Sequence, residues 1–155
     1  MTGKATWRSG PWDHEPDEVT WTSVDPAALV LQEVPCLVKR NMGIGSLCGY
    51  VFLPNNHPWA LVGFNQSSVD VHGGVSYARH ADGLFVVGFD CAHAWDVVPG
   101  IVGSSFGDCV YRDIEFVRGQ CEYLAQQARG AADAMLDEIE RAVCAEKRDE
   151  RLRRT

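Results

Sequence analysis

Two different periods of apolar residues divide the chain. In its first two thirds, short apolar runs and alternating stretches are typical of β-strands. Apolar and polar side chains alternate over Val69–His72, and the following Gly73-Gly74 pair predicts a bulge in that strand. Residues 81–83 (Ala-Asp-Gly) predict a tight turn that joins the last two strands as a hairpin. The strands are expected at Val34–Lys39, Leu47–Leu53, Val69–Tyr77 and Leu84–Phe89.

From Tyr111 onward, apolar residues recur every three or four positions, which predicts a helix beginning at about Arg112. Asp108 is its candidate N-cap, and Gly130 leaves either one long helix or two helices that break near it. The apolar positions are Ile114, Val117, Cys121, Leu124, Ala128, Met135, Ile139 and Ala142. The sequence therefore predicts an α+β fold, in which a small antiparallel sheet packs against a long C-terminal helix.

Two segments extend beyond this expected domain core. The apolar stripe of the helix continues past Gly130, further than a small sheet covers, so we expect residues 131–147 to pack against another chain or to fold back on their own helix. A homo-oligomer through the C-terminal helix would satisfy the first option. Residues 1–35 are rich in tryptophan and proline and are expected to form an irregular arm that packs on the single domain of residues 36–155.

Composition and charge narrow the classes of protein. Apolar residues make up 46% and charged residues 23%, as in globular proteins. The N-terminal residues lack the apolar segment of a secretory signal, and the apolar runs are too short for a bilayer, so we expect a cytoplasmic protein without membrane contact. Six scattered cysteines without a C-x-x-C pair predict reduced thiols and no structural zinc site. The net charge of −7 argues against general nucleic-acid binding and suits a cation.

Three short segments concentrate the reactive side chains. They are residues 55–58 with His57, residues 70–74 with His72, and residues 90–96 with Asp90, His93 and Asp96. The third segment follows a buried strand, and its three polar residues are spaced so that one turn brings them together. If the hairpin forms with Gly74 near Phe89, we expect His72 and His93 to face one cavity together with Asp90 or Asp96.

Two imidazoles beside carboxylates suit several roles. The set His72, His93 and Asp96 fits a divalent metal, with Asp90 as a further catalytic candidate. The same residues fit a metal-free acid–base pair, in which an aspartate orients a histidine, or purely structural hydrogen bonds within the loops. Cys91 is a candidate nucleophile, although an inert core thiol is the commoner outcome after a buried strand.

Other residues are candidates for ligand binding around this site. Gly73 and Gly74 would let a ligand approach the backbone closely. Tyr77 and Trp95 would wall a pocket, and His57 would add a third imidazole.

Several segments between Leu47 and about Ala128, roughly half of the chain, resemble a family of small uncharacterised proteins found in phages and in bacterial genomes. The resemblance implies a phage or prophage setting, hence a host cytoplasm, and no particular reaction. This chain departs from the family by having Trp95 where a small residue is common and a short link at Arg79–Gly83. The matching segments are Leu47-Cys48-Gly49-Tyr50-Val51, His57-Pro58, Val71-His72-Gly73-Gly74-Val75-Ser76-Tyr77, Gly88-Phe89-Asp90-Cys91-Ala92-His93-Ala94-Trp95-Asp96 and Tyr111-Arg112-Asp113.

The leading hypothesis is a phage-type accessory protein with a small-molecule or metal site. If the protein is an enzyme, metal-assisted hydrolysis is the expected reaction, because a bound metal lowers the pKa of its water. A second hypothesis is a non-enzymatic binder that sequesters a nucleotide signal or blocks a host protein. A third is a virion or assembly component that uses the C-terminal helix.

Overall fold

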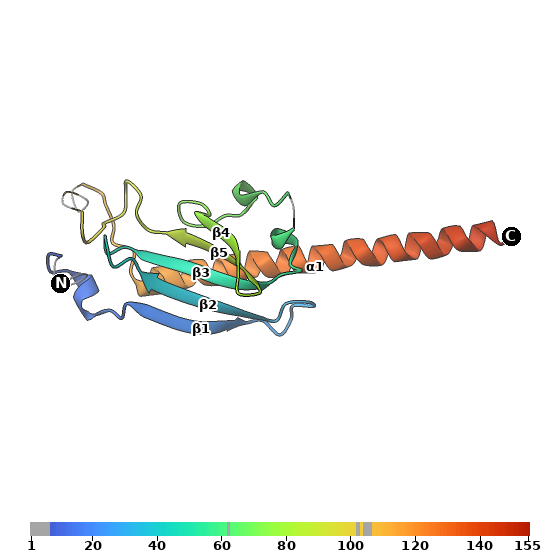
Figure 1. The fold of residues 1–155 in the computed structure, drawn as a ribbon, viewed down its shortest axis with the longest axis horizontal. Helices are drawn as coiled ribbons and strands as arrows, with labels where there is room; N and C mark the ends of the chain where they lie inside the picture. The colour runs from blue at the N-terminus through green and yellow to red at the C-terminus, as the bar shows by residue number, and fades with distance from the viewer. Residues whose placement is uncertain (1–6, 62, 102, 104–106) are drawn as a thin grey trace.

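A five-stranded antiparallel sheet packs against one 40-residue helix, α1 (Ile114–Arg153), which confirms the predicted α+β fold (Figure 1). The computed structural model describes residues 7–61, 63–101, 103 and 107–155. The strands are β1 (Glu18–Val24), β2 (Glu33–Arg40), β3 (Leu47–Pro54), β4 (Tyr77–Ala81) and β5 (Leu84–Asp90), in the sheet order β1-β2-β3-β5-β4. Short 3-10 helices lie at η2 (Pro11–His14), η3 (Pro58–Ala60) and η4 (Gln66–Ser68).

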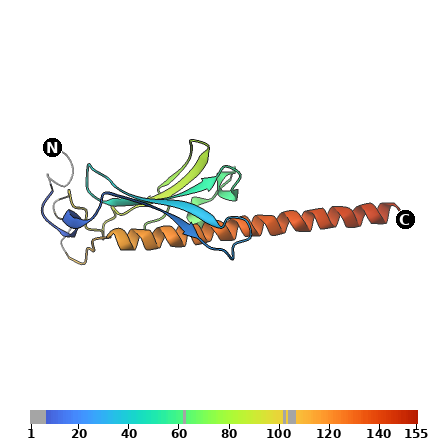
Figure 2. The same cartoon turned by 90° about the horizontal axis from the view of Figure 1, so that it is seen from below.

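Three of the four predicted strands are confirmed, and their alternation explains which face is buried. Along β2, Val34, Cys36 and Val38 are buried while their neighbours are more exposed. The helix contributes Val117, Cys121, Leu124 and Ala128, all fully buried, to the same core. Figure 2 shows α1 lying along this one face of the sheet and continuing beyond it.

The predicted strand at Val69–Tyr77 is wrong, because β4 begins only at Tyr77. Gly73 and Gly74 adopt φ values of +70° and +83°, which a regular strand does not allow, so residues 69–76 form a loop. The hairpin itself is present: Asp82 and Gly83 both have positive φ, as the tight turn between β4 and β5 requires.

The N-terminal segment is less irregular than expected. β1 pairs antiparallel with β2 from Glu18 to Val24, so the irregular arm predicted for residues 1–35 is wrong over this stretch. Its alternation of Val19 and Trp21 with threonines is a strand pattern that the surrounding prolines obscure. The arm does pack on the domain, since Trp12 is 3% exposed and its ring meets the ring of Tyr111 edge-on at 5.2 Å. Residues 1–6 lie outside the described part.

The helix differs from prediction in its start and in its continuity. Its N-cap is Asp113, which accepts a hydrogen bond from the Phe116 amide at 2.8 Å, and not Asp108. The helix runs without a break through Gly130, because one glycine costs only about 1 kcal/mol relative to alanine. Residues 131–147 therefore do not fold back on the same helix, and every residue from 137 to 155 is exposed. Packing against another chain stays a prediction.

The structure also bears on the predictions about membrane spans and cysteines within the described residues. None of its helices is both long enough and apolar enough to cross a bilayer. All six cysteines are free thiols, of which Cys36, Cys91 and Cys121 are buried.

A buried arginine joins the N-terminal arm to the sheet and to the start of α1. The side chain of Arg40 is fully buried and forms ion pairs with Asp17 at 2.8 Å and Glu15 at 3.5 Å. It also donates to the carbonyl of Gly45 and to the hydroxyl of Tyr111. Glu15 in turn accepts the hydroxyl of Tyr111 and the first amide of α1. Removing this guanidinium leaves several polar groups without their donor.

We therefore predict that Arg40→Met lowers the free energy of unfolding by about 3 kcal/mol. This value is at the lower end of the range for removing one partner of a buried ion pair. The lower end applies because Asp17 and Glu15 are partly exposed and water can solvate their carboxylates. Lys39→Met is the matched control, because Lys39 is the exposed neighbour on the same strand, and it should change stability by less than about 0.5 kcal/mol. Urea denaturation measures both. Equal losses in the two variants would contradict a structural role for Arg40.

Candidate functional site

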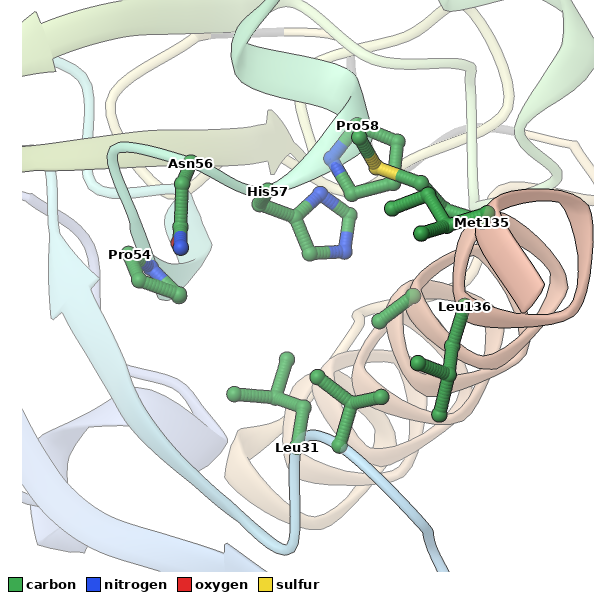
Figure 3. Close-up of a pocket in the computed structure, with 10 residues that line it drawn as sticks. Leu31, Pro54, Asn56, His57, Pro58, Met135 and Leu136 are labelled. Atoms are coloured by element: carbon green, nitrogen blue, oxygen red, sulfur yellow. The ribbon is translucent and has the colours of Figure 1, made fainter. Parts of the chain in front are cut away.

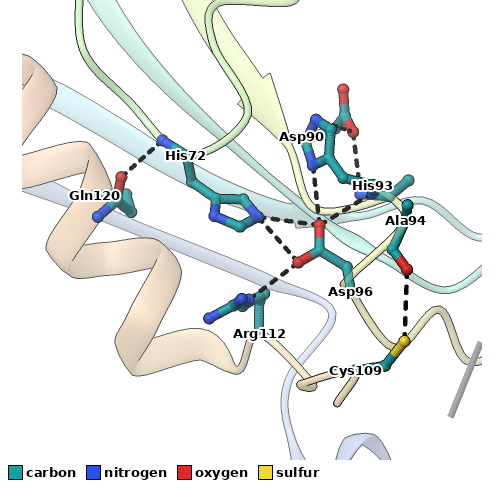
Figure 4. Close-up of polar contacts among 9 residues, drawn as sticks. His72, Asp90, His93, Ala94, Asp96, Cys109, Arg112 and Gln120 are labelled. Atoms are coloured by element: carbon teal, nitrogen blue, oxygen red, sulfur yellow. Dashed lines mark hydrogen bonds and ion pairs between the residues drawn. The ribbon is translucent and has the colours of Figure 1, made fainter. Parts of the chain in front are cut away.

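Two loops bring together a histidine pair and a buried carboxylate, as Figure 4 shows. Nε2 of His72 lies 3.0 Å from both carboxylate oxygens of Asp96, and Nδ1 of His93 lies 2.9 Å from one of them. The two imidazole rings are 5.2 Å apart. The predicted proximity of His72, His93 and Asp96 is therefore confirmed, although His72 lies in a loop and not on the predicted strand. That the two rings face one cavity stays a prediction.

The helix fixes the loop that carries His72. The backbone amide of His72 donates to Oε1 of Gln120 at 2.8 Å, and its ring packs edge-on against Phe116 at 5.1 Å. Nearby, Asp70 is held in the same way, because its amide donates to Gln127 at 2.9 Å. Amide side chains of α1 thus replace the strand pairing that this loop lacks.

Gly73 is the point where the His72 loop touches His93. A Cβ atom placed on Gly73 would lie 2.0 Å from Cε1 of His93, and its φ of +70° already disfavours any other residue. Gly74 has φ +83° but has nothing within 4 Å of the corresponding position. The glycine pair therefore serves close packing at Gly73 and the turn alone at Gly74.

The second loop holds Asp96 in place through its own backbone. The Asp96 amide donates to the carbonyl of His93, and the His93 amide donates to the Asp96 carboxylate at 3.0 Å. Residues 95–97 also form a parallel bridge with Val110, just before α1. These backbone contacts anchor the carboxylate independently of its contacts with the two imidazole rings.

Asp96 is 1% exposed, yet it is surrounded by donors. Burial by itself would raise the pKa of its carboxyl, but hydrogen bonds from the His72 ring, the His93 amide and Arg112 outweigh burial and hold the pKa below its usual value. Nε of Arg112 donates at 3.0 Å, and its guanidinium stacks over the ring of Phe116 at 4.9 Å. An ionised carboxylate only accepts hydrogen bonds, so each imidazole presents an N–H to it.

The three side chains also have the arrangement of metal ligands. One nitrogen of His72, one nitrogen of His93 and one oxygen of Asp96 all lie within 4.8 Å of one another. Ligands of a tetrahedral zinc ion, with bonds of 2.0–2.2 Å, are about 3.4 Å apart, so side-chain shifts of about an ångström would accommodate the ion. The other nitrogen of His93 lies 3.8 Å from Asp90, which is where a carboxylate orients a metal-bound imidazole.

Cys91 does not fit the nucleophile role. Its side chain is 2% exposed, and burial raises the pKa of its thiol strongly, with the negative charge of Asp96 adding to the rise. A thiol held in its protonated form is a poor nucleophile. Any metal-free chemistry at this site would therefore use water, activated by His93 with Asp96 as the group that orients the ring.

Of the other candidate residues, Trp95 lies beside the histidine pair and Tyr77 lies on the sheet. Trp95 stacks on His93 with ring centroids 5.8 Å apart and is 54% exposed, so it borders the site. Tyr77 lies opposite Gly88 and packs on Tyr50, away from the histidines.

His57 is separate from the histidine pair and has a structural role. Its ring bridges the amide of Trp59 and the carbonyl of Ala128, at 3.0 and 2.8 Å, and burial lowers the pKa of the imidazole. Ala128 is eight residues along α1 from Gln120, which is about 12 Å. His57 therefore fixes the loop after β3 to the helix, beside a different cavity (Figure 3).

Sequence reasoning missed Arg112, Phe116 and Gln120, which hold the two loops. Arg112 lies in a segment on which the resemblance to phage proteins rests, and the sequence offers no other signal for it. Phe116 and Gln120 are spaced by four residues and share a helix face, and Arg112 lies just before the helix, but nothing in the sequence tells which loops they meet. No protein-family model, curated protein or solved structure matches this chain.

We predict that Gly73→Ala and Gly74→Ala differ in their effect on the site. Both variants place alanine in a left-handed conformation, which costs about 1–2 kcal/mol, so both lower the free energy of unfolding. Gly73→Ala must also displace the His93 ring, and it should lose roughly a further 1 kcal/mol or more.

Thermal unfolding measures the stability difference, and nuclear magnetic resonance of the imidazole protons reports whether His93 has moved. Gly74→Ala is the matched control for backbone strain. Equal destabilisation with unchanged His93 signals in both variants would contradict the close packing of Gly73 on His93.

Proposed function

We propose that the protein is a phage-type accessory protein with a divalent-metal site formed by His72, His93 and Asp96. One observation supports the metal site most strongly: two imidazole nitrogens and one carboxylate oxygen, brought from two separate loops, lie within 4.8 Å of one another. Structural histidines commonly bond to nearby backbone, as His57 does. Here both rings instead point at one buried carboxylate.

The donor set favours zinc or a similar transition metal. Two nitrogens and one oxygen suit zinc, iron, cobalt or nickel better than calcium or magnesium, which prefer oxygen. The ring of His93 is 23% and that of His72 10% exposed, so the site is accessible from solvent on the imidazole side. Three protein ligands would leave a position for water, as in catalytic zinc sites.

We infer metal-assisted hydrolysis as the reaction of this site. The metal would supply a water of lowered pKa, and that hydroxide would attack a carbonyl or phosphoryl centre of a small-molecule substrate. Asp90 would orient His93 through its second nitrogen, and Arg112 would keep Asp96 ionised. Trp95, exposed beside His93, would form one wall for the substrate.

A metal-free acid–base pair is the second candidate, because Asp96 already accepts hydrogen bonds from both imidazoles. A non-enzymatic binder of a nucleotide signal or a host protein, and a virion or assembly component, are proposals of other classes. Metal binding without any hydrolysis would favour the binder. Hydrolysis that a chelator does not affect would favour the metal-free pair.

We predict that the chelator-treated protein binds one zinc ion per chain in isothermal titration calorimetry. His72→Ala and His93→Ala should each weaken binding by at least about 100-fold, since each removes a ligand, and Asp90→Asn should weaken it about 10-fold through the orientation of His93. Added zinc should raise the rate of hydrolysis of activated carboxyl or phosphate esters.

His14→Ala is the matched control, because His14 is an exposed histidine outside the cluster, and it should bind zinc as the unmodified protein does. Circular dichroism checks that each variant is folded. Folded protein that binds no zinc, or variants at His72 and His93 that bind it as tightly as the His14 control, would contradict the proposal.

A further inference from the structure

From residue 137 onward, α1 extends beyond the rest of the described structure. Its last buried residue is Ala132, and every residue from 137 to 155 is exposed. In proteins most of the stability of a helix comes from the packing of its apolar face, and these residues have no such packing. Among the exposed residues, Ile139 and Val143 are 50% and 43% accessible although both are large and apolar.

An apolar cavity opens where the helix leaves the sheet (Figure 3). It has a volume of about 410 Å³ and lies between the loop at Leu31, the residues after β3 and the helix turn at Met135 and Leu136. Ile139 also lines it, so the cavity continues into the exposed apolar stripe of the helix. A polypeptide segment that packs against the exposed apolar residues of the helix would therefore also cover the cavity.

The charges of this helix half are divided along its length. Residues 133–140 contain four acidic and no basic residues, namely Asp133, Asp137, Glu138 and Glu140. Residues 147–154 contain five basic and two acidic residues, the basic ones being Lys147, Arg148, Arg151, Arg153 and Arg154. The two blocks are symmetric about the bond between Val143 and Cys144.

We propose that this helix half pairs antiparallel with the same segment of a second copy of the chain. A segment with acidic residues at one end and basic residues at the other is complementary to itself after a two-fold rotation, which is the symmetry of most homodimers. A parallel pair would instead set acid against acid and base against base, which is unfavourable. The charge order therefore selects both the partner and the orientation.

The register follows from the same symmetry. Leu136, Glu140, Val143 and Lys147 are spaced by four, three and four residues, so they lie on one side of the helix, as seam residues of a coiled coil do. With the two-fold axis between Val143 and Cys144, each Val143 lies at the level of the partner's Cys144, and the two Val143 side chains meet beside the axis. Glu140 then lies opposite the partner's Lys147.

At the outer ends of the pair, Leu136 lies opposite the partner's Arg151. The aliphatic stem of that arginine would extend over the mouth of the apolar cavity, which Leu136 lines. The central valines and these stems supply the apolar contact, and the ion pairs supply the orientation.

Sedimentation analysis of the full chain at tens of micromolar tests this pairing. We expect a dimer of twice 17.1 kDa whose dissociation constant rises at least about 10-fold between 50 mM and 500 mM salt, because its ion pairs are exposed. Glu140→Lys should dissociate it by setting lysine against the partner's Lys147, and Lys147→Glu should do so by setting glutamate against the partner's Glu140.

The double variant E140K/K147E should restore the dimer. Glu140 and Lys147 are seven residues apart, about 10 Å along one helix, so this rescue cannot come from a pair within one chain. Arg141→Glu is the matched control, because Arg141 is exposed on the opposite side of the helix and its reversal should leave the dimer intact. All three positions are exposed, so the variants should fold.

Three results would overturn the proposal. A monomer at every concentration would assign the cavity to a small ligand or to a different protein. A dimer that ignores Glu140→Lys and Lys147→Glu, or single variants that the double variant does not rescue, would place the contact elsewhere.

Discussion

The packing of the first half of α1 on one face of the sheet is the interaction on which the rest of the structure depends. Five fully buried residues of the helix supply apolar contact with the core, namely Val117, Cys121, Leu124, Ala125 and Ala128. Burial of apolar surface, at about 25 cal/mol per Å², is the dominant favourable term in folding, and this contact closes the core over the sheet. Within the described residues, no second layer of this kind covers the opposite face of the sheet (Figure 2).

The same helix also fixes most of the surrounding loops through polar side chains. Gln120 accepts a hydrogen bond from the His72 amide, and the Ala128 carbonyl is hydrogen-bonded to the His57 ring. Just before the helix begins, Arg112 donates to Asp96. On the other flank, Glu122 accepts from Trp21 and Ser23 of β1. The geometry of the candidate site is therefore a consequence of where the helix lies, and not of strand pairing at the histidines.

Most of the fold could be predicted from the sequence, because its main elements carry strong periodic signals. The strands β2, β3 and β5 and the helix follow apolar periods of two and of three to four residues. The exceptions are local: a short alternation before Gly73 resembles a strand, but two left-handed glycines prevent pairing there. β1 was obscured by prolines, and the buried role of Arg40 depends on partners that are distant in the sequence.

The candidate site was predictable in its members and not in its geometry. His72, His93 and Asp96 were identified because reactive side chains cluster at a strand end, and the structure brings these three together. His57 and Tyr77 were assigned to the same site only by residue type, and the structure places each against other partners. Which loops meet at one carboxylate depends on Arg112, just before α1, and on Phe116 and Gln120 within it. A single sequence does not specify these contacts.

The proposed metal site consists of this buried carboxylate and the two imidazoles. Anomalous diffraction at the zinc edge, on crystals grown with one equivalent of zinc, tests it most directly. We expect one strong peak at about 2.0–2.2 Å from Nε2 of His72, Nδ1 of His93 and a carboxylate oxygen of Asp96. Zinc bound elsewhere, or no peak with both imidazoles still bonded to Asp96 at 2.9–3.0 Å, would contradict it.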